Sequence, residues 1–155
     1  MIDIRRLLVI SVCLFVMLSL CACCAEQTFS PETIRKVVSF DSGGITIKGT
    51  LDYAAGKEST FTVTEPENIS GTMFTDKEIS YGDIKIGYGK TKNDSPVSIL
   101  LTAVSDLVQR EIQIPVKGEY SYDEAFSSAG YRIVFECEKS EIKSIETEKF
   151  IFNFE

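Results

Sequence analysis

Residues 45–53 read ITIKGTLDY, and apolar or small side chains alternate there with polar ones. A period of two is the pattern of a β-strand that buries one face. Residues 34–40 alternate in the same way, and the turn-forming residues 41–44 (DSGG) join the two segments. The stretch 34–53 therefore predicts an antiparallel β-hairpin, and it makes the chain a candidate for a sheet-based fold.

Most of the remaining chain repeats this pattern in short segments separated by turn residues. The segment that begins at Phe61 is predicted to end at Pro66, because proline cannot donate a hydrogen bond to a strand ladder. Residues 123–130 are predicted to form a loop. The further segments predicted as strands are 71–75, 78–81, 83–88, 112–116, 118–122, 131–138, 141–146 and 150–154.

One segment has the period of an α-helix instead. Ser95 is predicted to cap it, and Pro96 suits its first position. An apolar helix face needs cover, which the sheet can provide. The sequence thus predicts a mostly β, α+β fold, in which one curved antiparallel sheet packs an amphipathic helix on its concave side. The residues of the apolar helix face are Val97, Leu100, Leu101, Val104, Leu107 and Val108.

The first 22 residues differ in character from the rest. Arg5 and Arg6 precede an uncharged apolar run, residues 7–20. As a helix this run would span about 21 Å, short of the ~30 Å hydrocarbon core of a bilayer. A signal peptide therefore fits better than a permanent transmembrane span.

The residues after this run resemble a lipobox, the processing site of bacterial lipoproteins. Leu20-Cys21-Ala22-Cys23 has an aliphatic residue three positions before a cysteine and a small residue just before it. The resemblance implies cleavage after Ala22 and a thioether between Cys23 and diacylglycerol, completed by a further acyl chain such as palmitate. Ordinary cleavage after Ala25 is the alternative. The protein is expected on the extracytoplasmic face of the cell membrane, anchored by lipid.

This processing divides the chain into three parts. Residues 1–22 are the signal peptide, residues 23–32 are a lipidated N-terminus and tether, and residues 33–155 are a single β-rich domain. Within the tether, Ser30-Pro31-Glu32 has the composition of a brief helical turn.

The mature chain is expected to be acidic. The full sequence has a formal net charge of −7, and removal of Asp3, Arg5 and Arg6 takes away one net positive charge and leaves −8. Such a surface repels nucleic acids and anionic headgroups, so no nucleic-acid partner is expected and membrane attachment depends on the lipid. Cys137 lies in an alternating segment and is predicted to be a small buried side chain, with a disulfide to Cys24 as the alternative.

The residue types needed for most catalytic sites are missing. The chain has no histidine, which removes the usual general base, most zinc sites and every Ser-His-Asp or Cys-His arrangement. Glu65 and Glu67 flank a proline, and Glu136 and Glu138 alternate outward, so both pairs are interpreted as solvated surface. We predict no enzymatic activity, no metal and no cofactor.

The order of the elements supports a resemblance to a known family. Gly49-Thr50-Leu51 is followed by residues 61–67 (FTVTEPE), Gly71 and Phe74, then by Ser95-Pro96 and a Phe-rich tail. In this order the chain resembles, over residues 33–155, the small lipoproteins of clostridia and their relatives that have the LolA-like fold. The resemblance implies an incomplete β-barrel, or half-barrel, closed by a helix. In the wider superfamily its cleft holds acyl chains.

Two functions follow as hypotheses. The first is a carrier that holds a lipid or lipoprotein acyl chain in the cleft between sheet and helix, where burial yields about 0.8 kcal/mol per CH₂. Its cleft would be lined by Leu100, Leu101, Val104, Phe61, Phe74 and Phe135, unless these residues simply pack together as a core. The second is an anchored interaction module, with a filled cleft, that binds an envelope or spore-cortex enzyme. Its partner strand would pair with exposed edges that carry Thr60, Thr62, Thr64, Tyr81 and Tyr88.

Overall fold

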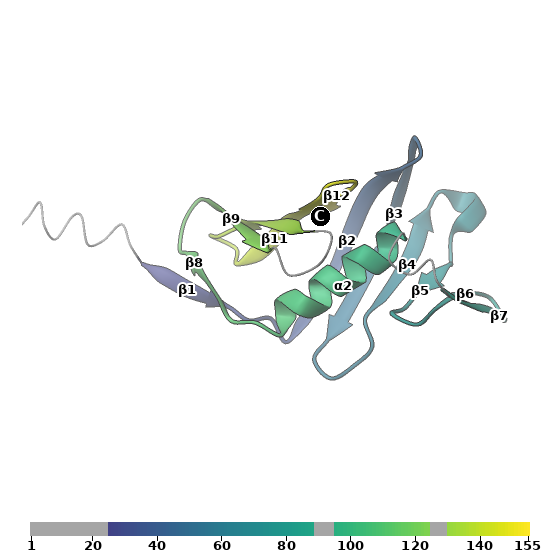
Figure 1. Ribbon diagram of the computed structural model, residues 1–155, viewed down its shortest axis with the longest axis horizontal. Coiled ribbons are helices and arrows are strands. Elements are labelled where there is room, and N and C mark those ends of the chain that lie inside the picture. The colour runs from purple at the N-terminus through teal and green to yellow at the C-terminus, as the bar shows by residue number, and fades with distance from the viewer. Residues whose placement is uncertain (1–24, 89–94, 125–129) are drawn as a thin grey trace, which may run out of the picture.

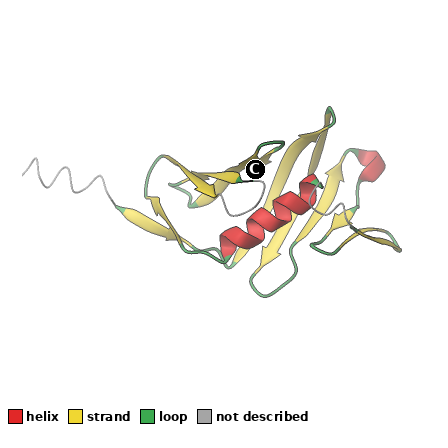
Figure 2. Cartoon of the chain, viewed as in Figure 1, coloured by secondary structure: helices red, strands yellow, loops and turns green. Residues whose placement is uncertain are grey.

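The structure, a computed structural model, describes residues 25–88, 95–124 and 130–155. Strands dominate it, and one α-helix crosses them (Figure 2). No helix among the described residues is long and apolar enough to cross a membrane. The prediction of a mostly β fold with an open, curved antiparallel sheet and one helix is confirmed over these residues.

The main sheet has ten strands, and all neighbours in it run antiparallel. Its last strand in the chain lies in the middle of the sheet and joins an N-terminal half to a C-terminal half (Figure 1). In spatial order the strands are β7 (Ile84–Gly87), β6 (Glu78–Tyr81), β5 (Met73–Phe74), β4 (Thr60–Glu65), β3 (Ile45–Ala54), β2 (Thr33–Ser42), β12 (Ile151–Phe154), β11 (Glu141–Thr147), β10 (Tyr131–Glu136) and β9 (Glu119–Glu124).

The predicted hairpin is the longest pairing in the sheet. β2 and β3 pair over their full length, from Thr33 opposite Ala54 to Ser42 opposite Ile45. Gly43 and Gly44 have φ angles of +61° and +82°. A two-residue hairpin turn of type I′ needs positive φ at both positions, which glycine adopts without steric cost. The hairpin prediction is confirmed.

The helix α2 (Pro96–Val108) begins where the sequence predicts. The predicted cap is wrong in its chemistry, because the Ser95 side chain makes no capping hydrogen bond. Instead the Ser95 carbonyl oxygen accepts a hydrogen bond from the Ile99 N–H at 3.0 Å. The apolar face of the helix turns inward, as predicted, except that Val108 is only partly buried.

The hydrophobic core lies between α2 and the sheet, which wraps around the helix. Phe61 on β4 and Phe135 on β10 lie far apart in strand order, yet both belong to one buried cluster with the helix. Aromatic rings span the middle of the sheet, since the Phe40 ring lies 5.2 Å from that of Phe152 and 6.0 Å from that of Phe61. Cys137 is fully buried in the same cluster, as predicted.

A second, two-stranded sheet corrects the predicted tether. β1 (Glu26–Phe29) pairs with β8 (Ile112–Pro115), so that four residues of the expected tether over residues 23–32 belong to the folded structure. β8 was expected in the main sheet and lies outside it. Phe29 explains the docking: its side chain is buried and its ring lies 4.9 Å from that of Phe135.

Hydrogen bonds reinforce this second sheet. The Gln27 side-chain amide donates to the carbonyl oxygens of Pro115 and Cys137. The helical turn predicted at Ser30-Pro31-Glu32 is absent, and these residues link β1 to β2 without helix. Smaller corrections concern residues 71–75, of which only Met73–Phe74 are strand, and the predicted loop 123–130, whose first two residues belong to β9.

Candidate functional site

The residues predicted to line a lipid cleft all lie in the core between helix and sheet. Phe61, Phe135, Leu100 and Val104 have no exposed surface, and Leu101 is 2% exposed. Phe74 is partly buried and packs against the same cluster, with its ring 6.5 Å from that of Phe61. The structure thus brings the six residues together, but as side chains that fill the space between helix and sheet.

The edges predicted to pair with a partner strand are also placed differently. Thr62 lies within the sheet, because its strand β4 has β3 on one side and β5 on the other. Tyr88 is buried, and its hydroxyl donates a hydrogen bond to the Thr75 carbonyl oxygen at 2.9 Å. Tyr81 is exposed, on β6 beside the edge strand β7. The prediction that both tyrosines lie on exposed edges is therefore wrong for Tyr88.

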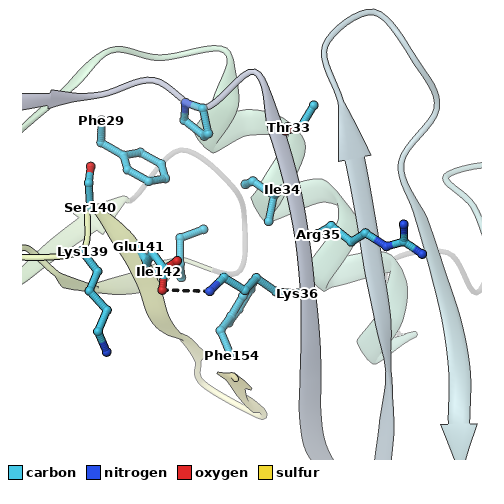
Figure 3. Close-up of a pocket in the computed structure, with 11 residues that line it drawn as sticks. Phe29, Thr33, Ile34, Arg35, Lys36, Lys139, Ser140, Glu141, Ile142 and Phe154 are labelled. Carbon is cyan, nitrogen blue, oxygen red and sulfur yellow. Dashed lines mark ion pairs between the residues drawn. The ribbon is translucent and has the colours of Figure 1, made fainter.

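A pocket of about 420 Å³ lies at the junction of the two halves of the main sheet (Figure 3). We call it the seam pocket. Its wall on one side comes from the end of β1 and the start of β2, and on the other side from the β10–β11 turn, β11 and the end of β12. Its lining residues are Phe29, Pro31, Thr33, Ile34, Arg35, Lys36, Lys139, Ser140, Glu141, Ile142 and Phe154.

The seam pocket exists because β12 is shorter than its neighbours. β12 pairs with β2 through Ser39 and Val38, and the Glu155 N–H donates to the Val37 carbonyl oxygen at 2.9 Å. The first residues of β2, 33–36, pair with β3 on one side and have no ladder partner on the other among the described residues. On β11, Glu141 and Ile142 likewise pair with β10, Lys143 lies at a bulge, and the ladder with the described part of β12 begins only at Ser144. Two strand edges therefore face each other across the pocket.

One ion pair spans the pocket. The Lys36 ammonium lies 2.8 Å from a carboxylate oxygen of Glu141, and Figure 3 shows the two side chains meeting between their strands. Because Ile34 and Val38 are buried and side chains alternate along a strand, Lys36 points to the core side of the sheet. Its side chain is 29% exposed. This pair closes part of the space that a further strand would occupy.

The other two cations of the pocket turn toward acids outside it. Arg35 lies 3.4 Å from Asp52 on β3, and Lys139 lies 2.9 Å from Glu136. The hydrogen bond from Lys139 to Glu136 raises the pKa of the Lys139 ammonium, so it stays charged. Three cations and one carboxylate line the pocket of a chain whose net charge is −7. Cations therefore outnumber carboxylates among the lining residues, although each cation is paired with an acid.

The pocket combines an apolar floor with polar walls. Phe29, Ile34 and Ile142 are buried beneath it. Ser140, on its rim, has a φ of +52°, which is uncommon for a residue other than glycine. No group of three or more His, Cys, Asp or Glu within the described ranges could hold a metal ion. The arrangement suits binding of a ligand with both apolar and hydrogen-bonding groups.

Sequence reasoning did not find this pocket, although one signal was present. Lys36 falls on the same phase of the strand pattern as Ile34, Val38 and Phe40, which are buried. A charged residue on the buried phase of a strand marks a place where the core is open or a partner charge is present. Cys23, the predicted lipid attachment site, lies outside the described residues.

Comparison of the chain with family models, curated proteins and solved structures found no significant match.

Proposed function

We propose that the protein is a lipid-anchored module of the cell envelope that binds a protein partner at the seam pocket. One observation carries the proposal: the space between helix and sheet is filled by the residues that would have held an acyl chain, whereas the seam pocket is open. The carrier function is therefore the weaker of the two hypotheses. No enzymatic role is proposed.

The chemistry of the pocket walls favours a protein over a lipid. Strand edges carry unpaired N–H and C=O groups, which an acyl chain cannot satisfy and a polypeptide can. The open, curved sheet crossed by a helix is compatible with the half-barrel of the LolA-like fold. Kinship with the small clostridial lipoproteins, in which some relatives are thought to bind envelope or spore-cortex enzymes, is part of the proposal.

The proposed anchor determines where the pocket sits. Cys23 precedes Phe29 by six residues, which span at most about 20 Å when extended. Phe29 lines the seam pocket. A diacylglyceryl group on Cys23 would therefore hold the pocket close to the extracytoplasmic surface of the membrane. The β6–β7 hairpin lies at the other end of the molecule (Figure 1).

Site-specific crosslinking in producing cells tests the proposal. A photoreactive residue at Thr33, an exposed pocket position, should give one discrete protein adduct, identified by mass spectrometry and then shown to bind as a purified protein. The same residue at the exposed Glu148, outside the pocket, is the control. Equal adducts at both positions, or none at Thr33, would overturn the proposal.

Two further measurements separate the module from the carrier and test the anchor. Native mass spectrometry of the chain without its leader should find no bound lipid, and a stoichiometric acyl ligand would favour the carrier. Cys23→Ser should give an uncleaved precursor or a form released from the membrane. Unchanged maturation and membrane retention would contradict the anchor.

A further inference from the structure

We infer that the seam pocket receives its partner as an extended strand, which continues the path of β12 and pairs with both β2 and β11. The inference rests on the proposed function and specifies how that partner binds. It follows from the register of the sheet, the side-chain contact between the two edges, and the charges that line the pocket.

The register fixes the direction of the inserted strand. β12 runs antiparallel to β2, with Asn153 opposite Ser39 and Phe154 opposite Val38. A strand that follows the same line would meet Lys36 first and Ile34 two residues later. It would run antiparallel to β11 as well, since β12 does so. Backbone hydrogen bonds would then form on both sides, whereas a strand added to the outer edge of a sheet gains them on one side.

The two edges are close enough for their side chains to meet. Neighbouring strands lie about 4.8 Å apart, so a strand inserted between two edges needs them about 9.6 Å apart. Lys36 and Glu141 extend from the two edges toward each other, with their charged groups 2.8 Å apart. The volume of about 420 Å³ lies within the ~300–1,000 Å³ of typical ligand pockets. Insertion would require the ion pair to open, and with the side chains partly exposed this costs little.

The pocket chemistry predicts a short sequence pattern in the partner. Directly opposed residues of an antiparallel pair point to the same face. The residue opposite Lys36 would be acidic, because its carboxylate would take the place of Glu141. The residue opposite Ile34, two positions later, would be apolar, because it would lie over a floor that includes Phe29 and Ile142. The expected pattern is acidic–any–apolar, in a segment close to the membrane surface.

Binding of short synthetic peptides to the purified, anchor-free chain tests this inference. The probe is an eight-residue peptide with polar residues at even positions and apolar residues at odd positions, including Leu at position five, except that position three is Glu. The control has Lys in place of Glu. We expect the Glu peptide to bind at least about tenfold more tightly than the Lys peptide in fluorescence anisotropy.

A modified peptide and a protein variant keep the test specific for strand pairing. A Glu peptide methylated on alternate backbone nitrogens keeps its side chains but loses its donors, and should bind at least about tenfold more weakly. Lys36→Glu should invert the preference and favour the Lys peptide, which a merely unfolded variant would not do. Hydrogen exchange should slow at residues 33–36 and 141–143 on binding.

The outcomes distinguish this inference from the proposed function. Equal binding of the methylated and unmethylated peptides, or no binding of the Glu peptide up to about 1 mM, overturns strand insertion. If crosslinking at Thr33 still identifies a protein partner, the interaction module stands with another binding mode. If crosslinking also fails, both strand insertion and the interaction module are overturned.

Discussion

The interior beneath α2 and the floor of the seam pocket both hold buried Ile and Phe side chains, but the first is filled and the second is open. Beneath the helix, large side chains such as Leu100 and Phe61 meet from opposite sides and leave no exposed surface. At the seam, Ile34 and Ile142 lie on β2 and β11 at positions that β12, which pairs with both strands, does not reach within the described residues. Exclusion of solvent from the interior therefore depends on complete strand pairing as well as on apolar side chains.

The largest expected effect is on the filled interior. Phe135→Ala should lower the free energy of unfolding by about 3–5 kcal/mol, because it removes a fully buried ring and leaves a cavity. Urea denaturation measures this loss. Ile151→Ala, at a side chain 54% exposed, is the control and should change stability by less than about 0.5 kcal/mol. A small loss at Phe135 would mean that the interior is loosely packed, and the contrast with the seam would disappear.

A close backbone approach in the same interior predicts the next effect. A Cβ at Gly49 would lie 2.5 Å from a Phe61 ring carbon and 2.5 Å from the Thr62 carbonyl oxygen. Gly49→Ala should therefore cost about 1–3 kcal/mol through overpacking. Gly87→Ala is the matched control, since the nearest atom to its Cβ would be 4.0 Å away. Urea midpoints of the two variants should differ clearly, and equal midpoints would contradict the tight packing of β3 on β4.

Alkaline pH should weaken the folded state through two buried groups. Burial raises the pKa of the Cys137 thiol above its usual 9.0, and burial raises the pKa of Tyr88 to about 12. The folded chain therefore keeps protons that the unfolded chain has already released. The free energy of unfolding should fall as pH rises from about 9 toward 12.

Urea midpoints at a series of alkaline pH values check this fall. Cys137→Ala and Tyr88→Phe should each flatten it, which separates these groups from exposed lysines whose raised pKa values act in the same direction. In the native state Cys137 should also resist thiol reagents, because it is fully buried. Rapid labelling without unfolding would show that the interior is open.

The smallest effect on stability is expected at the seam. Glu141→Gln removes the charge opposite Lys36, and because both side chains are partly exposed the loss should be below about 1 kcal/mol. The same variant should strengthen binding of the Glu peptide, because Lys36 is released from its own partner. Glu148→Gln should change neither quantity. A loss above about 2 kcal/mol at Glu141 would mean that the seam is part of the closed core.

Local sequence patterns predicted the parts of the fold that depend on neighbours in the chain. The β2–β3 hairpin follows from alternation and a glycine turn, and α2 from its apolar period and Pro96. The strand β8 was predicted, but β1 was assigned to the tether, and the pairing of the two was missed because it joins distant parts of the chain. Its best signal was Phe29, a large apolar residue within an expected tether.

The candidate site depended even more on distant parts of the chain. The pocket lies beside parts of β2 and β11 that the described β12 does not pair with, and no local pattern specifies which residues of distant strands will pair. The sequence did show Lys36 as a charged residue at one of the alternating strand positions that are otherwise buried. Its partner Glu141 lies in another half of the sheet, so sequence spacing alone gave no reason to join them.

The central position of β12 also bears on the order in which the chain can fold. The hairpin of β2 with β3 and the group of β9, β10 and β11 can each form from neighbouring segments, but in the described residues it is β12 that pairs with both β2 and β11. Residues 151–154 are made after both of these groups, so the two groups are expected to stay separate on the ribosome until β12 emerges. The pairing of β12 with β2 links residues more than a hundred positions apart. It therefore carries a large loop-closure cost and is expected to be the slow step of folding.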